Sequence, residues 1–389
     1  MTTMPAFNEV RVDPPDWPRR IADTDGAQVI VGGPGTGKTE FLVRRALALL
    51  DERSIDPGAL LVLSFGRRGV ADLRERIRTG LQRSVSQTDV TTFHAFAARV
   101  LELRAVDRGW AQPPEVLTGP EQVALVHSLL TEADPRRFSP AFREVLSTST
   151  FAAEVTDFVL RCREQLLAPA SLAAVCATRA EWRGLAEFVA RYDAQLRASS
   201  RIDYGTLLAE AVRAVEAEPD GIVSQLTHVL VDEYQDTTPA QARLLRAITG
   251  AGAHLTVAAD PYQSIYSFRG ASVHNVVNFA TEFGDADHPA RRLVLTTSFR
   301  TPRAVLDAAV RVTAGGELPG AAGPVEPAAG EGRVDVHRFD QETEEAEWIA
   351  AEVLRLHLEE GIAYSDIAVF VRSKRRFLPD LSRALARRG

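Results

Sequence analysis

The sequence is poor in cysteine and contains no long apolar run. Two cysteines, Cys162 and Cys176, in 389 residues cannot by themselves form a disulfide framework or a metal cage, so we expect a reducing compartment, the cytoplasm. No stretch approaches the roughly 18 consecutive apolar residues of a membrane span. The first twenty residues also lack the basic tip and apolar core of an export signal. These absences argue against a secreted disulfide scaffold and against a membrane partner.

Lysine is almost absent as well, because only two of the 45 basic residues are not arginine. The formal net charge is −7, which taken alone argues against a nucleic-acid partner. Residues 61–110, however, carry nine arginines against five acids, and residues 372–389 carry seven basic residues against one acid. A net charge averages over faces that never meet the same ligand, so binding to nucleic acid is not excluded.

The composition is typical of a globular protein, with 45% hydrophobic and 25% charged residues. A chain of this length is expected to form two or three domains. Short apolar runs alternate with longer segments of helical periodicity, which predicts an α/β fold with a doubly wound parallel sheet. The expected strands are residues 28–31, 60–63, 228–231, 254–258, 293–296, 333–337 and 367–371.

Two further segments depart from this alternation. Residues 97–200 show helical spacing with no convincing strand, above all in 141–167 and 180–197, which predicts an all-helical insertion in the first α/β domain. Residues 313–332 are rich in glycine, proline and alanine, which is typical of a loop or linker.

The first predicted strand is followed by Gly-Gly-Pro-Gly-Thr-Gly-Lys-Thr at residues 32–39 and then by an amphipathic helix. This order matches the P-loop, whose backbone N–H groups surround a phosphate while Lys38 places a charge beside it and Thr39 offers a hydroxyl to Mg²⁺. The alternative is a glycine-rich turn that only caps a helix; the complete pattern and both flanks favour the P-loop. The residues expected at the nucleotide are Gly33, Pro34, Gly35, Thr36, Gly37, Lys38, Thr39 and Glu40.

Two adjacent carboxylates, Asp232 and Glu233, directly follow the predicted strand 228–231. Carboxylates at the end of a buried strand are costly unless a cation compensates them. In a P-loop protein the simplest arrangement is Mg²⁺ held by Asp232 and Thr39, with Glu233 orienting and deprotonating the attacking water. A solvated helix N-cap is the alternative for this pair alone.

Six motifs in order resemble those of superfamily 1A DNA helicases of the UvrD, PcrA and Rep type. Motifs I to IV correspond to residues 32–39, DEYQDT at 232–237, DPYQSIYSFRGA at 260–271 and LTTSFR at 295–300. Residues 63–77 are similar to motif Ia, and TFHAF at 92–96 is similar to motif Ib. The arginine bias also resembles actinobacterial AdnA/AdnB helicase-nuclease motors.

The resemblance implies an ATP-driven translocase on single-stranded DNA, with 3′→5′ direction and a role in DNA repair or recombination. It implies catalytic contacts by Lys38 and Glu233, by Gln263 to the γ-phosphate or attacking water, and by Arg300 to the γ-phosphate. Alone, an arginine such as Arg300 at a helix start is normally a solvated surface residue.

The resemblance also implies a DNA-binding surface. Tyr266 and Phe268 would stack on bases, whereas ordinary core packing is the alternative for both rings. Phe65, Thr92 and His94 fall where the family contacts the strand; an isolated histidine between phenylalanines is otherwise a hydrogen-bonded structural residue. Arg67 begins a helix in the basic region and would meet backbone phosphates, with a solvated helix face as the alternative. Every proposed site residue lies at or after the carboxyl end of a predicted strand, where open parallel sheets bind ligands.

The chain departs from the family pattern near its beginning. The glutamine that reads adenine ahead of motif I is missing, and Trp17 stands near its place, where it would stack on the base. Selectivity for ATP over other nucleoside triphosphates is therefore open.

The domain organisation implied is a first RecA-like ATP-binding domain at 1–96 and 201–292, a helical insertion at 97–200, and the beginning of a second RecA-like domain at 293–389. The chain stops before motifs V and VI, so we expect the 389 residues alone to bind ATP and Mg²⁺, hydrolyse ATP poorly and not unwind duplex. The expected partners are single-stranded DNA, its junctions with duplex, and a helicase-nuclease partner subunit.

Two other functions remain open from the sequence. One is a non-motor subunit that binds DNA or serves assembly in a helicase-nuclease complex. The other is a different P-loop enzyme, such as a small-molecule kinase, which would leave residues 92–96 and 264–271 unexplained.

Overall fold

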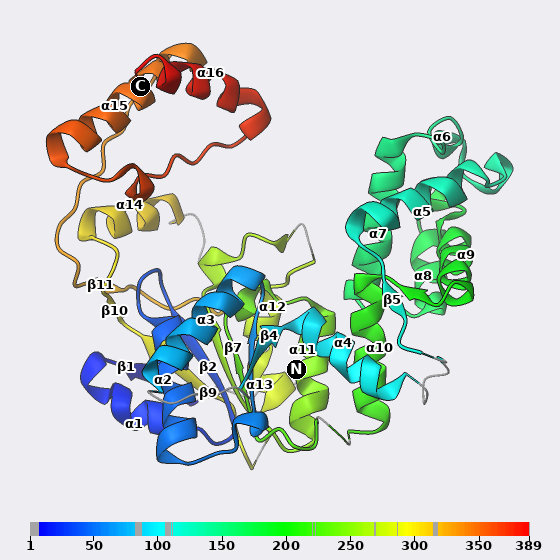
Figure 1. Cartoon of the computed structure of the whole chain (residues 1–389), viewed down its shortest axis with the longest axis horizontal. Coiled ribbons are helices and arrows are strands. Elements are labelled where there is room, and N and C mark those ends of the chain that lie inside the picture. Colours follow the sequence, from blue (N-terminus) through cyan, green and yellow to red (C-terminus); the bar gives the residue numbers. More distant parts are fainter. Residues whose placement is uncertain are drawn as a thin grey trace. The chain divides into compact units, whose positions relative to one another are not determined.

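The computed structural model describes residues 8–81, 88–105, 110, 112–219, 221, 223–267, 270–285, 287–313 and 318–388 (Figure 1). The chain divides into two compact units, Met1–Gly332 and Arg333–Gly389. None of the helices in these ranges is both long and apolar enough to cross a membrane.

A parallel sheet of seven strands forms the centre of the first unit, in the order β1-β9-β2-β8-β7-β3-β4. The α/β parallel fold predicted from the sequence is therefore confirmed. The strands are β1 (Asn8–Val12), β2 (Ala27–Gly32), β3 (Leu60–Ser64), β4 (Asp89–Thr92), β7 (His228–Val231), β8 (His254–Ala259) and β9 (Arg291–Leu295). Sequence analysis missed β1 and β4, which lie at the two edges of the sheet and carry few strongly apolar residues.

Helices cover both faces of this sheet (Figure 1). Side chains alternate between the faces of a strand, so Val29 and Val31 of β2 pack into one core and Ile30 packs into the other. The Ile30 face is covered by α1 (Trp17–Ala22), α2 (Lys38–Leu47) and α3 (Arg67–Gly80). The Val29 face is covered by α4 (Phe93–Arg104), α10 (Tyr204–Ala217), α11 (Pro239–Gly250), α12 (His274–Val277) and α13 (Phe279–Phe283).

The predicted helical insertion lies between α4 and α10 and has an apolar core of its own. Its helices are α5 (Gly119–Thr131), α6 (Pro140–Arg143), α7 (Ser149–Glu164), α8 (Pro169–Ala177) and α9 (Leu185–Ala198). The short strands β5 (Glu115–Val116) and β6 (Arg201–Ile202) pair at its base. The first unit ends with β10 (Thr297–Ser298), α14 (Arg303–Thr313) and β11 (Glu326–Pro327).

The second unit packs α15 (Glu342–Glu360) against α16 (Lys374–Ala386). The strands predicted at residues 333–337 and 367–371 are wrong, since both segments are irregular. A strand needs a neighbour for its backbone hydrogen bonds, and no described segment of this unit provides one. Phe370 in the second segment is accordingly 94% exposed.

The compact units divide after Gly332, whereas the sequence predicted a new domain from residue 293. Strand β9 pairs on both sides, with β1 and with β2, and so belongs to the first sheet. The segment that follows it carries Arg300 back to the P-loop.

Candidate nucleotide and DNA site

The loop after β2 has the backbone conformation that its glycines permit. Gly35 and Gly37 have φ of +74° and +86°, in the left-handed region where a Cβ atom is strained. Lys38 begins α2, and its Nζ folds back to donate to the carbonyl oxygens of Gly32 at 2.8 Å and Gly33 at 3.0 Å. The loop thus has the turn and the helix N-terminus that a phosphate requires.

Lys38 also reaches the neighbouring strand. Its Nζ lies 3.5 Å from Oδ2 of Asp260, which is buried at the end of β8. The same Oδ2 accepts a hydrogen bond of 2.6 Å from Nε2 of Gln263. One carboxylate therefore joins the P-loop lysine to the glutamine predicted to sense the γ-phosphate.

Asp232 and Thr39 meet across the site. The Thr39 hydroxyl donates to Oδ2 of Asp232 at 3.1 Å, and burial together with the charge of Glu233 raises the pKa of Asp232 to about 6. A buried carboxylate beside a hydroxyl is a fitting donor set for Mg²⁺, and a bound cation would offset the cost of ionising Asp232. The structure thus brings together the two side chains that the sequence assigned to Mg²⁺.

Glu233 is held in a left-handed conformation, with φ of +56°. Its Oε2 accepts a 2.6 Å hydrogen bond from Nε2 of Gln235, a fully buried residue. The Oε1 atom of Gln235 in turn accepts from the backbone N–H of Asp260 at 3.0 Å. Sequence analysis assigned Gln235 no role, yet it links the proposed water-activating carboxylate to the loop after β8.

A group of aromatic rings lies on the other side of the P-loop. Trp17 is 6% exposed and packs edge-on against Phe41 of α2 and against Phe299, with ring centroids 5.6 Å and 6.2 Å apart. A Cβ atom added to Gly37 would lie 2.6 Å from Trp17. Trp17 is thus adjacent to the P-loop but mostly buried, and the exposed ring is that of Phe299, at 49%.

The segment after β9 rests on the P-loop. The Ser298 hydroxyl donates to the carbonyl oxygen of Pro34 at 2.8 Å, and the Phe299 N–H donates to that of Gly35 at 2.9 Å. An added Cβ at Gly35 would lie 2.8 Å from Cβ of Arg300. The exposed Arg300 side chain therefore starts beside the phosphate loop.

Glu40, which the sequence also assigned to the nucleotide, is paired with two arginines. Its carboxylate forms ion pairs of 2.6 Å with Arg44 and with Arg76 of α3. The Thr36 hydroxyl likewise donates within the loop, to Gly33 O at 2.9 Å.

Phe65 and Tyr266 are brought together from loops 201 residues apart in the chain. Their rings lie 4.6 Å apart at 31°, beyond the carboxyl ends of β3 and β8. Phe268 lies outside the described residues. A partly exposed aromatic pair at this edge of the sheet is a suitable platform for stacked bases.

Of the other residues predicted to bind DNA, one is exposed and two make contacts within the protein. The His94 ring lies 5.5 Å from that of Tyr204, which is 39% exposed, and burial lowers the pKa of His94. The Thr92 hydroxyl caps α4 by accepting from Ala95 N at 3.2 Å. Arg67 is exposed at the first turn of α3. Tyr204 was not predicted, and only its position beside His94 singles it out.

Residues 18–284 match the UvrD/REP helicase N-terminal domain. The chain belongs to this family. It is 28% identical over 361 residues to the ATP-dependent DNA helicase PcrA of Leuconostoc citreum, covering 91% of this chain and 46% of the relative. It is 29% identical over 367 residues to ATP-dependent DNA helicase UvrD1 of Mycobacterium tuberculosis, covering 89% and 45%. A Staphylococcus aureus PcrA is 24% identical over 358 residues, covering 91% and 47%. The chain thus spans just under half the length of these relatives.

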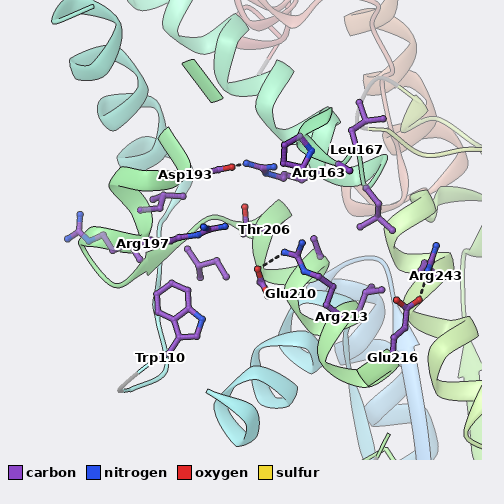
Figure 2. A pocket seen from close by; sticks show the side chains of 18 residues that line it. Trp110, Arg163, Leu167, Asp193, Arg197, Thr206, Glu210, Arg213, Glu216 and Arg243 are labelled. Carbon is purple, nitrogen blue, oxygen red and sulfur yellow. Dashed lines mark hydrogen bonds and ion pairs between the residues drawn. The ribbon is translucent and has the colours of Figure 1, made fainter. Parts of the chain in front are cut away.

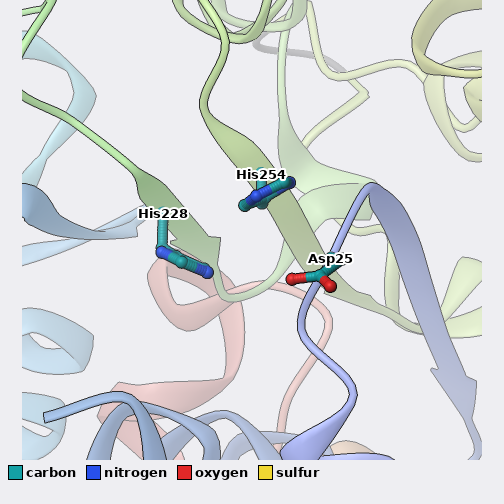
Figure 3. A group of neighbouring side chains, drawn as sticks. All are labelled: Asp25, His228 and His254. Atoms are coloured by element: carbon teal, nitrogen blue, oxygen red, sulfur yellow. The ribbon is translucent and has the colours of Figure 1, made fainter. Parts of the chain in front are cut away.

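A second group of polar side chains lies at the opposite edge of the helicase sheet, where β7 and β8 begin (Figure 3). Asp25, His228 and His254 have ligand atoms within 4.8 Å of one another. However, Nδ1 of His254 accepts from the Gly26 N–H at 2.9 Å, which leaves the proton of the neutral ring on Nε2, and Asp25 is paired with Arg53 at 3.3 Å. Because two of the three donors are already engaged, this group does not fit a divalent cation as arranged.

A cavity of 290 Å³ lies where the helical insertion of the helicase domain meets α10 and α11 (Figure 2). Arginines are frequent on its wall, but most are neutralised by carboxylates beside them. The pairs are Arg163 with Asp193, Arg213 with Glu210, Arg243 with Glu216, and Arg201 with Glu115. None of the residues assigned to the nucleotide lines this cavity.

Proposed function

We propose that this chain is the ATP-binding motor domain of a DNA helicase that hydrolyses ATP while moving along single-stranded DNA. The observation that carries the proposal is the continuous path from Lys38 through Asp260 to Gln263, which ends three residues before the Phe65–Tyr266 pair. Phosphate chemistry and base stacking are thereby attached to the two ends of one short loop.

The strand order supports an orientation for the nucleotide. The P-loop follows β2, which lies between β8 and β9. Acidic and amide groups lie on the β8–β7 side, and the Trp17–Phe299 rings lie on the β9–β1 side. The γ-phosphate then points to Asp232 and Glu233, and the base lies at the exposed ring of Phe299.

In this orientation each side chain of the site has a separate role. Lys38 and Arg300 bind phosphate oxygens, and Glu233 holds and deprotonates the attacking water. Thr39 and Asp232 would hold Mg²⁺, which supplies charge neutralisation on the phosphates when bound. Phosphates would draw Lys38 away from Asp260. The Asp260 carboxylate would then lose its lysine partner while still accepting the hydrogen bond from Gln263.

The loop after Gln263 would transmit this change to the strand. Tyr266 packs against Phe65 here, and a base inserted against either ring would gain about 1–3 kcal/mol. Movement of Gln263 shifts Tyr266 relative to β3, so the grip on a base depends on the nucleotide. We also assign residues 1–96 and 201–292, together with the rest of β9, to the first motor domain, 97–200 to the insertion, and the part of 293–389 that follows β9 to the start of the second.

The test is ATP hydrolysis with and without single-stranded DNA, comparing the wild type with Lys38→Ala and Lys374→Ala. Lys374, the other lysine of the chain, lies in the second unit and serves as the matched control. We expect slow but DNA-stimulated hydrolysis in the wild type and in Lys374→Ala, and its loss in Lys38→Ala. Equal rates in all three proteins would favour a non-motor DNA-binding subunit. Movement in the 3′→5′ direction, recognition of duplex junctions and a nuclease partner remain predictions.

A further inference from the structure

Arg45 is a fully buried arginine in α2, two turns after the P-loop lysine. Its Nη2 donates to the carbonyl oxygens of Arg20 and Asp23, the latter at 2.8 Å. Its Nε donates to the carbonyl oxygen of Ile21 at 3.3 Å. These are carbonyls at the C-terminal end of α1, where a helix leaves its oxygen atoms without intrahelical partners.

The remaining donors of Arg45 reach the sheet. Its Nη1 donates to Oε1 of Gln28 in β2 at 3.0 Å and to the hydroxyl of Thr256 in β8 at 2.7 Å. All five acceptors are neutral oxygen atoms. Burial lowers the pKa of Arg45 to about 9, so the guanidinium remains charged at neutral pH. A single side chain thus ties α1 to α2 and to two central strands.

The other end of α1 carries Trp17, which fills the space against Gly37 and supports Phe299. Phe41 connects the two ends, because its ring packs against Trp17 and lies 5.2 Å beneath the Arg45 guanidinium. The position of the rings beside the P-loop is therefore set by where Arg45 holds a helix of only six residues.

We propose that Arg45 is a positioning residue for the nucleobase. By binding the end of α1, it fixes Trp17 and through it the exposed face of Phe299, against which the base stacks. The proposal rests on the nucleotide site proposed above. The proposal assigns the two parts of the nucleotide to different residues. Binding of the triphosphate depends on Lys38, and binding of the adenosine depends on Arg45.

The experiment compares the affinities of the 389-residue chain for Mg·ATP and for Mg·tripolyphosphate, a probe with no base. The ratio of the two affinities reports the adenosine contribution alone. We expect Arg45→Met to lower this ratio about tenfold while tripolyphosphate affinity changes less than about threefold. Arg45→Lys should lie between, because an ammonium has three donors in place of a five-donor fork.

Arg163→Met is the control for loss of a buried arginine, since Arg163 is largely buried in the helical insertion and paired with Asp193. It should leave the ratio unchanged. Thr256→Val removes one acceptor while keeping Arg45, and should lower the ratio in the same direction by less, even if Arg45→Met does not fold.

Three results with the variants would overturn the proposal. The first is an unchanged ratio of affinities in folded Arg45→Lys and Thr256→Val. The others are an equal loss of ATP and tripolyphosphate affinity in the Arg45 variants, or the same change of the ratio in Arg163→Met. A wild-type chain that binds tripolyphosphate but gains nothing from adenosine would also overturn it, while leaving the phosphate site intact. A wild type that binds neither ligand would instead contradict the proposed function, and this proposal with it.

Discussion

The Nζ atom of Lys38 lies 3.5 Å from Oδ2 of Asp260, and both groups are buried. The lysine predicted to bind phosphate donates to this carboxylate and to the carbonyl oxygens of Gly32 and Gly33. Phosphate must therefore compete with Asp260 for Lys38, and the outcome of that competition reaches Gln263 through the same carboxylate. In the function proposed above, this contact is the route by which an occupied P-loop would change the loop that carries Tyr266.

Replacing Asp260 by asparagine should strengthen phosphate binding and weaken coupling. A neutral amide competes less for Lys38 and does not repel a triphosphate, so affinity for Mg·tripolyphosphate should rise about fivefold. The stimulation of ATP hydrolysis by single-stranded DNA should fall, because Gln263 loses its charged partner. Titration calorimetry and steady-state kinetics measure the two effects; Asp285→Asn, at an exposed carboxylate, is the control. Weaker phosphate binding in Asp260→Asn would contradict the proposed competition between phosphate and Asp260 for Lys38.

Glu233→Gln should separate binding from hydrolysis. The amide keeps the size of the side chain and its contact with Gln235 but cannot take a proton, so DNA-stimulated hydrolysis should fall about 10²- to 10⁴-fold. Affinity for ATP should stay within about threefold of the wild type. The paired variant Glu216→Gln, remote from the P-loop and bound to Arg243, should hydrolyse normally. Retention of most activity in Glu233→Gln would assign the base to another residue.

Tyr266→Ala should weaken binding of single-stranded DNA by about 5- to 150-fold, from the loss of about 1–3 kcal/mol of stacking on one base. Fluorescence anisotropy with a labelled oligonucleotide measures this loss, and Phe65→Ala should produce a similar one because the two rings form one platform. Phe158→Ala, which removes a ring packed on Trp182 within the insertion, is the control. DNA affinity equal to the wild type in both site variants would place the strand elsewhere.

His228 should make stability depend on pH. Burial, and then the neighbouring His254, lower the pKa of His228 to about 4; Arg53 and Arg45 act in the same direction, and Asp25 opposes them. The unfolded chain binds a proton below about pH 6.5, while the folded chain does not until about pH 4. The free energy of unfolding should therefore fall by about 2 kcal/mol as pH drops across that range.

Urea unfolding at about pH 7 and about pH 4.5 measures this fall. In His228→Asn the difference between the two pH values should be smaller by most of that amount, while in His288→Asn, at an exposed histidine, it should equal the wild type. An unchanged pH dependence in His228→Asn would show that this histidine is not the group that titrates.

The phosphate loop and the acidic pair were predictable because their chemistry is local. Gly35 and Gly37 supply positive φ angles within one loop, and Lys38 follows at the first turn of a helix. Asp232 follows a strand whose four residues are all buried. The meeting of Asp232 with Thr39 then follows from parallel strands ending at one edge of a sheet.

The links between these parts were not predictable in the same way. Gln235 joins Glu233 to Asp260 only because β7 and β8 are neighbours. Arginine in an amphipathic helix suggests a solvated face, and nothing in its spacing shows that Arg45 is buried under the carbonyls of α1. The strands predicted at 333–337 and 367–371 failed for a related reason, since apolar alternation does not supply a pairing partner.

The sequence by itself determined the parallel α/β architecture and the conformation of the P-loop, because periodicity and turn chemistry depend on residues that are adjacent in the chain. Only the tertiary structure decided which side of the P-loop carries the acids and which carries the aromatic rings. That depends on β2 lying between β8 and β9, an order set by the packing of distant segments and by no local pattern.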